Sequence, residues 1–512
     1  MAEKNEAMKS IALAEYAEAE RRFDSKESQR LREQSLRFSV RDGAFWSVMT
    51  SFGENFISAF AIALKATSFE LGLLASLPVL IGSLIQLPAA GFIELWGERK
   101  KIIGYAVFIQ ALSWIPILLI PFFFAGHAIT VLLVFFTFYF VLGQLANPAW
   151  QSLMGDLVPA EMRGKFFANR NKVIRVASFG STIAAGMILG AFPESESSIF
   201  LGFGIIFGIA MLARFASWHY IGRMHEPAPV LRREHSHDFI DFMENLTKTN
   251  FGKFVLFSAL FTFSMQVAAP YFSLFMLREL GFNYVSFTFV IASGIIGAII
   301  AYNFWGRMAD RFGNRKLLTI TTILVCLTPA LWLVNQSLAF LIAIEFIAGF
   351  YYAGFSQCLG NFVFDSTLPE IRHKQVAFYN AINGTALFAG AMAGALLLYA
   401  FPKSAFWLSG IILVFAVSSI LRLSVAFLVL PAVKEERKVE EISEAELIAR
   451  IASINTIKGI FGESLADIRN GLVLGARDIQ ALERLALRAS RSSGRASGKS
   501  AEAKRRGTAK TE

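Results

Sequence analysis

Apolar residues occur along most of this chain in long runs that short polar stretches separate. A helix needs about 20 apolar residues to cross the hydrocarbon core of a bilayer. Twelve runs have about this length, at about 45–64, 71–93, 102–124, 129–154, 167–192, 199–221, 251–277, 285–305, 317–334, 338–364, 376–401 and 405–430. We therefore expect an all-α membrane protein with twelve transmembrane helices.

The most charged short connection lies between the eighth and ninth runs, from Gly306 to Lys316. It carries five charged side chains, four of them basic. Positive charge in a short loop resists transfer across the bilayer, which keeps such loops on the cytoplasmic side. We expect a hairpin at the cytoplasmic surface in which glycine lets the chain turn.

Two pairs of segments indicate that the chain is duplicated. Residues 90–100 repeat residues 306–316 at an offset of 216 (310 minus 94). Residues 156–163 repeat residues 365–372 at an offset of 209 (365 minus 156). Because repeats at a fixed spacing reveal architecture, we expect two similar six-helix bundles.

These motifs resemble the signatures of the major facilitator superfamily of secondary transporters, over about 45–431. The resemblance implies two pseudo-symmetric bundles that rock around a central cavity, with Asp310 capping the eleventh helix and with Arg311 and Arg315 tying the inner gate. The matching gating residues are Glu94, Gly97, Arg99, Asp156, Arg163, Gly306, Asp310, Arg311, Gly313, Arg315, Asp365 and Arg372.

The runs and motifs divide the chain into five parts. We expect a cytoplasmic arm, two bundles with a cytoplasmic linker between them, and an amphipathic, basic tail, at 1–42, 43–221, 222–250, 251–431 and 432–512. The connections on one side of the twelve runs carry most of the basic residues, so we expect both termini in the cytoplasm and the chain in the cell membrane. The tail either contacts anionic lipid or is a solvated tail.

The composition excludes several other classes of protein. Over half of the residues (55%) are hydrophobic and 17% are charged, which excludes a soluble globular chain. The net charge of +10 indicates orientation in the membrane and contact with lipid, not nucleic-acid binding. Cys326 and Cys358 lie inside apolar runs, where we expect packing and neither a disulfide nor a metal site. We expect a monomer without a cofactor.

Ionisable residues inside apolar runs are costly, so each is a candidate for function. Glu54, next to Asn55, lies about nine residues or roughly 13 Å into the first run, where a carboxyl group could carry protons or pair with a buried cation such as Arg175. Arg175 itself either binds an anionic substrate or reaches the headgroups. Glu345 is a second candidate for proton binding or for an outer gate. For Arg214 and Arg422 we expect structural roles.

Three uncharged polar residues, Gln144, Asn147 and Gln151, share one face of the fourth run. They could line a substrate cavity or hydrogen-bond neighbouring helices. No phosphate loop or hydrolase motif occurs, so we expect no enzyme.

The sequence therefore predicts a transporter that moves a small organic solute by alternating access, coupled to protons. Two alternatives stay open. One is an energy-independent facilitator, and the other is a receptor or scaffold with a transporter fold that signals through its tail.

Overall fold

The computed structural model describes residues 26–96, 98–158, 163–192, 196–227, 239–367, 372–401, 410–435 and 439. In this part of the chain every regular element is a helix, as the apolar pattern predicts. The chain divides into two compact units, Met1–Ile451 and Ala452–Glu512, and all described residues belong to the first. The predictions for residues 1–25 and for the tail beyond Val439 lie outside the described residues.

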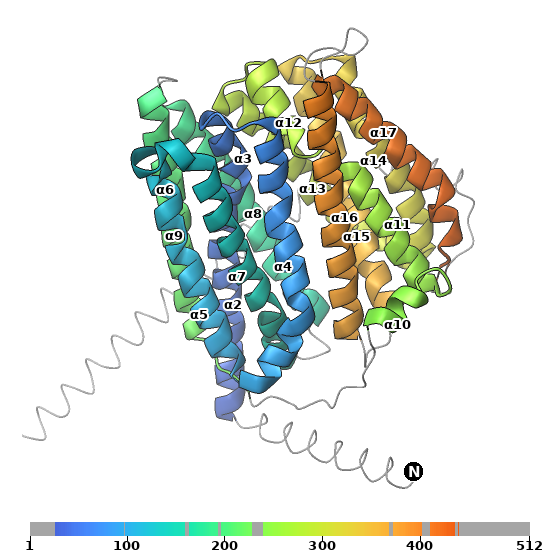
Figure 1. Ribbon diagram of the computed structural model, residues 1–512. Coiled ribbons are helices and arrows are strands. Elements are labelled where there is room, and N and C mark those ends of the chain that lie inside the picture. The colour runs from blue at the N-terminus through green and yellow to red at the C-terminus, as the bar shows by residue number, and fades with distance from the viewer. Residues whose placement is uncertain are drawn as a thin grey trace, which may run out of the picture. The chain divides into compact units, whose positions relative to one another are not determined.

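The first half of the described chain forms one bundle of helices (Figure 1). Its helices are α2 (Lys26–Phe52), α3 (Glu54–Ala63), α4 (Ser68–Trp96), α5 (Arg99–Leu112), α6 (Trp114–Phe123), α7 (Ala128–Leu157), α8 (Arg163–Gly190) and α9 (Glu196–Gly222), with the 3-10 turn η1 (Ala125–His127). We call this bundle the N-half.

The second half forms the neighbouring bundle, which we call the C-half. Its elements are α10 (Phe239–Glu244), α11 (Asn250–Gln266), α12 (Tyr271–Leu274), the π-helical turn η3 (Phe275–Glu279), α13 (Tyr284–Phe312), α14 (Asn314–Val334), α15 (Leu338–Asp365), α16 (Arg372–Ala400), α17 (Gly410–Leu428) and the 3-10 turn η4 (Leu430–Ala432). The short α10 lies in the predicted linker.

Eleven helical stretches of the described residues are long and apolar enough to cross a membrane. The remaining expected crossing is divided into α2 and α3, with a break at Gly53. A side chain at Gly53 would overlap the Trp114 ring, so the break brings the backbone close to α6. The run between 251 and 277 is likewise interrupted, because α11 ends before Pro270, whose ring lacks an amide donor. Apolar length alone does not reveal such breaks.

The charged connection between the eighth and ninth crossings is shorter than the sequence predicts. Helix α13 continues to Phe312, and α14 begins at Asn314. The turn is a single residue, Gly313, whose φ of 88° favours glycine. The hairpin lies where the sequence predicts it. Its charged residues, however, belong to the last two turns of α13 and the first turn of α14 and not to a loop.

One end of the molecule carries this connection and Arg99, and we call it the charged end. The largest hydrophobic core lies toward the opposite end and contains residues of both halves, such as Phe60 and Phe203 of the N-half and Phe287 and Phe415 of the C-half. A second core cluster, which includes Ile103, lies at the charged end. In contrast to the first, it contains no residue of the C-half among the described residues. The halves are thus packed together mainly toward the opposite end.

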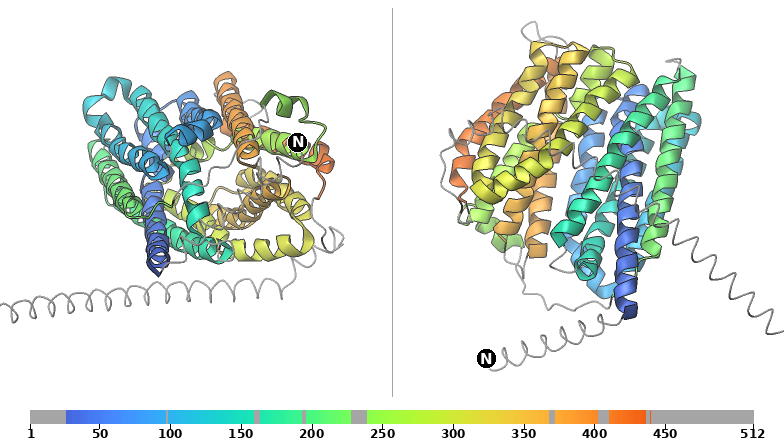
Figure 2. Two further views of the ribbon diagram at one scale, coloured as in Figure 1. Left: turned by 90° about the horizontal axis from the view of Figure 1, so that it is seen from below. Right: turned by 180° about the vertical axis from the view of Figure 1, so that it is seen from behind.

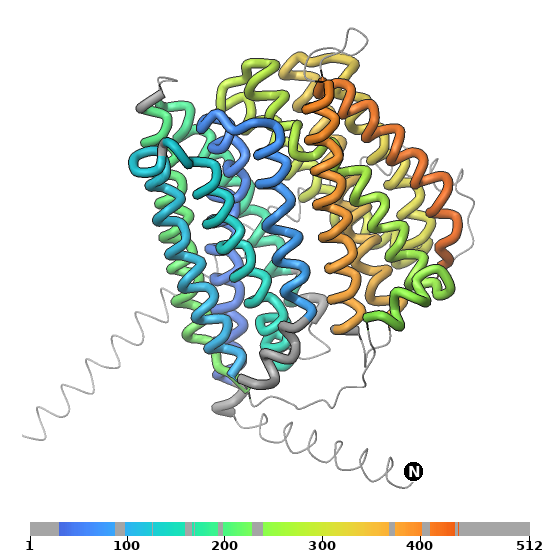
Figure 3. Tube along the Cα trace, in the orientation of Figure 1, coloured from blue at the N-terminus to red at the C-terminus, as the bar shows by residue number. Residues whose placement is uncertain are grey.

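Two helix pairs form most of the contact between the halves. Helix α4 packs against α16 and α8 against α13, and α4 and α16 run side by side in Figure 3. Helix α2 extends past its neighbours at the charged end (Figure 2, right). Its residues Leu36 and Phe38 pack on the core cluster there, so the described part of the predicted arm is continuous with the first crossing.

Candidate functional site

A polar cavity lies inside the N-half. Its volume is about 360 Å³. Every residue that lines it belongs to the N-half, on helices α2, α3, α5, α7, α8 and α9. Four of these residues are acidic or basic, namely Asp42, Glu54, Arg170 and Arg214. Because charged side chains are costly within a bilayer, this grouping makes the cavity a candidate functional site.

Glu54 stands at the first position of α3, directly after the break at Gly53. The Tyr139 hydroxyl lies 2.6 Å from Glu54 Oε1 and 2.6 Å from Met49 Sδ. The single hydroxyl proton can be donated to only one of these acceptors at full strength. Tyr139 can therefore donate to the Glu54 carboxylate, or turn to Met49 and accept a proton from a neutral Glu54. The site accommodates both protonation states.

A chain of polar contacts links the same cavity to the charged end. Arg214 donates to Gln110 Oε1 over 2.7 Å and to Ser217 Oγ over 3.0 Å. Ser217 donates to Asp42 over 2.7 Å, and Arg170 lies 3.6 Å from the other Asp42 oxygen. Asp42 is only 3% exposed. Glu54 also lies within electrostatic range of Arg214, so Arg214, and not the predicted Arg175, is its cationic neighbour.

The C-half contains a smaller pocket of about 260 Å³. Glu345 lines it and accepts a hydrogen bond from Trp332 Nε1 over 3.2 Å. Arg422 of α17 also lines it and is 1% exposed. The predicted titratable residue Glu345 thus lies in a largely apolar pocket of its own half, together with Arg422.

Arg422 is held by backbone carbonyl groups. Its guanidinium donates to Val325 O over 3.0 Å and to Met265 O over 3.3 Å. Pro329 stands four residues after Val325 and has no amide proton, which leaves the Val325 carbonyl in need of another donor. The structural role expected for Arg422 agrees with these contacts, because its guanidinium supplies the donor that the Val325 carbonyl lacks.

Arg175 lies between the halves. Its guanidinium carbon is 3.4 Å from the centre of the Tyr302 ring on α13, a cation–π contact. Gln86 of α4 accepts a hydrogen bond from Asn380 of α16 over 2.8 Å and donates to Gln144. Arg175 therefore lies at the contact between the bundles. Gln144 is joined to that contact through Gln86.

The remaining polar candidates are more exposed. Asn55 reaches Thr182 of α8 at 3.4 Å. Gln151 donates to Asn147 within α7 over 3.3 Å, and Asn147 also lines the N-half cavity. The predicted polar stripe on α7 thus divides, because Gln144 bonds a neighbouring helix and the other two bond each other.

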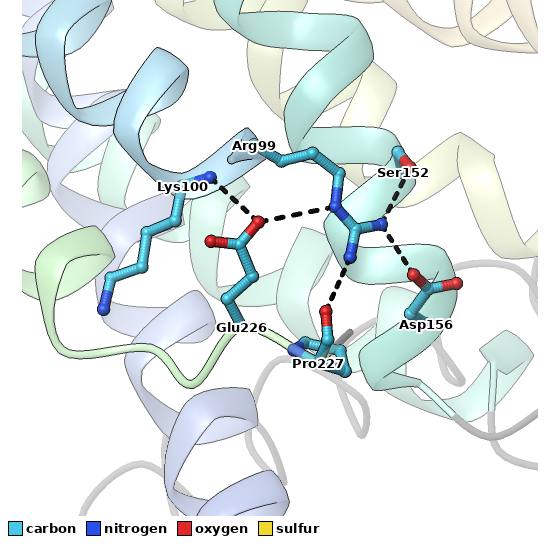
Figure 4. Close-up of polar contacts among 6 residues, drawn as sticks. All are labelled: Arg99, Lys100, Ser152, Asp156, Glu226 and Pro227. Atoms are coloured by element: carbon cyan, nitrogen blue, oxygen red, sulfur yellow. Dashed lines mark hydrogen bonds and ion pairs between the residues drawn. The ribbon is translucent and has the colours of Figure 1, made fainter. Parts of the chain in front are cut away.

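At the charged end of the N-half, Arg99 joins three chain segments (Figure 4). It donates to Asp156 over 2.6 Å and to Ser152 over 3.0 Å, both on α7. It also donates to the Pro227 carbonyl over 3.0 Å and lies 3.6 Å from Glu226. Arg99 is 4% exposed, so this is a buried ionic network.

The C-half repeats this arrangement with different side chains. Asn314 donates to Asp365 over 2.6 Å. Glu435 accepts from the amide of Arg315, the second residue of α14, over 2.8 Å. Glu226 accepts likewise from the amide of Lys100, the second residue of α5, over 3.3 Å. In each half, a glutamate that follows the last helix caps the third crossing, where negative charge is favourable.

The other predicted gating residues are placed as follows. Arg311 and Asp310 are exposed at the end of α13, and Gly306 faces Gln357. Gly97 and the side chains of Glu94, Arg163 and Arg372 lie outside the described residues. Residues 368–371, which precede α16, and the side chains of its first two residues lie outside them as well, so the capping of the eleventh helix by Asp310 stays a prediction.

The sequence interpretation missed Asp42, Tyr139, Glu226 and Glu435. A signal existed for the two glutamates, because their spacing (435 minus 226) equals the repeat offset of 209. No comparable signal existed for Asp42, which the sequence places in a polar arm. Its burial depends on which faces of α2, α8 and α9 meet.

Comparisons with known proteins agree with this architecture. Residues 254–474 match the family model described as Major Facilitator Superfamily. Among solved structures, the chain is similar to a D-xylose–proton symporter (TM-score 0.62, 13% identity, 80% of this chain and 99% of that one). It is also similar to the nucleoside transporter NupG (0.56, 16%, 79% and 99%) and to a bacterial homologue of the iron transporter ferroportin in an inward-facing state (0.53, 14%, 78% and 99%). No curated protein sequence matches significantly. The second half of the chain thus matches the major facilitator superfamily, and the fold as a whole is similar to that of these solved transporters.

Proposed function

We propose that the protein is a secondary transporter that moves a small organic solute by alternating access and couples this movement to protons. The family and the fold support the transporter class. The observation that carries the coupling is the placement of Glu54 in a polar cavity, next to a hydroxyl group that suits both of its protonation states. A group that gains and loses a proton as access changes can link solute movement to a proton gradient.

The two halves support a rocking motion. They share a hydrophobic core toward the opposite end, and we assign the charged end to the cytoplasm of a cell-membrane protein because basic connections remain there. Both termini would then be cytoplasmic.

The substrate is a polar organic solute. Two proteins of similar fold are, by their descriptions, a nucleoside transporter and a D-xylose–proton symporter. The polar groups between the halves include Gln86, Asn380 and Arg175. Amides suit hydroxyl-rich solutes, whereas the guanidinium would also accept a carboxylate.

The test begins with purified full-length protein and a thermal-shift screen of nucleosides, pentoses and small carboxylates, since a bound solute stabilises by mass action. Hits are then followed as labelled solutes into proteoliposomes with and without a pH gradient. Proton coupling predicts that an uncoupler removes accumulation, and that Glu54→Gln removes it while solute exchange persists. Accumulation that survives Glu54→Gln contradicts the role of Glu54.

The two alternatives give different results in this assay. A facilitator equilibrates solute but does not accumulate it, with or without the gradient. A receptor or scaffold that signals through residues 432–512 moves no solute, whereas a transporter that lacks residues 436–512 still moves it.

A further inference from the structure

We infer that Asp42 is a proton relay, and that the N-half cavity is the route by which Glu54 exchanges protons with the charged end. This inference rests on the proposed proton coupling and goes beyond it. It separates the path of the proton from the path of the solute between the halves.

The cavity spans the required distance. Its lining includes Arg170 and Ile221 toward the charged end and Glu54 at the start of α3. Water occupies about 30 Å³ per molecule in the liquid, so a polar cavity of 360 Å³ has room for several water molecules. A proton can therefore travel through it without entering the contact between the halves.

Asp42 is the group in this route that can pass a proton on. Arginine stays protonated in proteins, which excludes Arg170 and Arg214 as carriers. Asp42 lies between them, near Arg170 of α8 and Arg214 of α9, with the Ser217 hydroxyl 2.7 Å from its oxygen. The groups that face Glu54 are Tyr139 of α7 and Arg214.

The transfer is a simple exchange of protons. A hydronium ion at the charged end gives its proton to the Asp42 carboxylate and becomes water. The O–H bond on Asp42 then breaks as cavity water carries the proton to Glu54, where a new O–H bond forms. Asp42 returns to the carboxylate, and both arginines keep their charge throughout.

The test follows the proton and needs no solute. Infrared spectra of the purified full-length protein are recorded after rapid pH jumps, and the carboxylic-acid band of Glu54 is assigned by its loss in Glu54→Gln. Asp42→Asn keeps the size of the side chain but cannot carry a proton. We expect the Glu54 band to approach its final value at least about threefold more slowly in this variant. The two proteins are compared after pH jumps that end equally far from the midpoint of each protein's own Glu54 titration.

The matched control is Asp241→Asn, the same change at an exposed position of α10, which should keep the wild-type rate. A slowing of less than threefold in Asp42→Asn overturns the relay. Should Asp42→Asn fail to fold, Ser217→Ala replaces it under the same threshold, because it removes the hydroxyl group that joins Arg214 to Asp42 and keeps both charges. If wild-type protein shows no Glu54 band that responds to pH, the proposed proton coupling itself fails, which is a distinct outcome.

Discussion

Arg99 and Asp156 meet at the charged end of the N-half, where a guanidinium nitrogen lies 2.6 Å from a carboxylate oxygen. Arg99 is the first residue of α5, and Asp156 is in the last turn of α7. The pair therefore fixes the end of the third crossing against the end of the fourth. The Arg99 side chain is 5% exposed and that of Asp156 is 32% exposed. Solvent therefore reaches Asp156 only in part and weakens its attraction to the buried Arg99 only in part.

Removing either partner of this pair should destabilise the protein, and by different amounts. Asp156→Asn keeps an acceptor for Arg99, so we expect a loss of about 1–2 kcal/mol in the free energy of unfolding. Arg99→Met also leaves Asp156 without its cation and the Pro227 carbonyl without its donor, so its loss should be larger, about 3 kcal/mol. Unfolding in mixed micelles measures both. Equal losses would show that the ionic contact contributes little.

The repeat predicts that the two capping glutamates act independently. Glu226 and Glu435 each accept from a first-turn amide of a different half. We expect Glu226→Ala and Glu435→Ala to cost about 1 kcal/mol each, and the double variant to cost their sum, since distant sites are additive. The same unfolding assay checks this. A marked departure from additivity would mean that the caps are coupled through the contact between the halves.

The sequence could predict the crossings and the charged connections between them, because charge and apolar length are local properties. The crossings follow from the length of the apolar runs. The turn at Gly313 follows from the glycine and the charges between two runs, and the candidates Glu54 and Glu345 follow from charged residues within a run. The pairing of Asp42 with Arg170 does not, because it depends on the faces that α2 and α8 present to each other. Tyr139 was hidden for a related reason, since one aromatic hydroxyl is ordinary in an apolar run.

The breaks in the crossings were also beyond the sequence pattern. Gly53 and Pro270 interrupt helices whose hydrophobicity is continuous. Glycine and proline are tolerated in membrane helices when neighbours satisfy the freed backbone groups. Whether such a residue breaks a helix depends on those neighbours, such as Trp114 beside Gly53, and not on the residue alone.

The contact between Arg175 and Tyr302 should respond to the ring and not to the hydroxyl group. Tyr302→Phe keeps the aromatic face, whereas Tyr302→Leu removes it. We expect a double-mutant cycle with Arg175→Gln to give a coupling of about 0.5–2 kcal/mol for Tyr302→Leu and a much smaller one for Tyr302→Phe. Unfolding of the four proteins in each cycle provides the measurement. Equal coupling in both cycles would assign the contact to the hydroxyl group.

Close packing of the halves near the opposite end should be sensitive to one glycine. A side chain at Gly186 of α8 would overlap Thr288 of α13, whereas one at Gly180 of the same helix meets nothing within 4 Å. We expect Gly186→Val to destabilise the packed arrangement by about 1–3 kcal/mol more than the control Gly180→Val. Unfolding and the labelling of a cysteine placed at Thr288 both report this. Similar behaviour of the two valine variants would contradict the packing of α8 against α13.

Arg422 should be among the residues most important for the stability of the C-half. Its guanidinium donates to two carbonyl groups at once, at Val325 and Met265, and the Met265 carbonyl also accepts from backbone amides. Arg422→Met keeps much of the volume but leaves the Val325 carbonyl without a donor in a buried site, so we expect a loss of about 1–3 kcal/mol. Arg422→Lys should recover only part of it, because one ammonium group lacks the planar fork that reaches two carbonyls.

A second arginine of the C-half provides the control for this effect. Arg278, an exposed residue of η3, donates to the Ile62 carbonyl over 3.4 Å. Arg278→Met removes the same charge and the same guanidinium, but the Ile62 carbonyl keeps the Lys65 amide as a donor, so its cost should stay below about 1 kcal/mol. If Arg422→Met unfolds like Arg278→Met, the Val325 carbonyl needs no buried cation, and the charge of Arg422 would instead act in the pocket that it shares with Glu345.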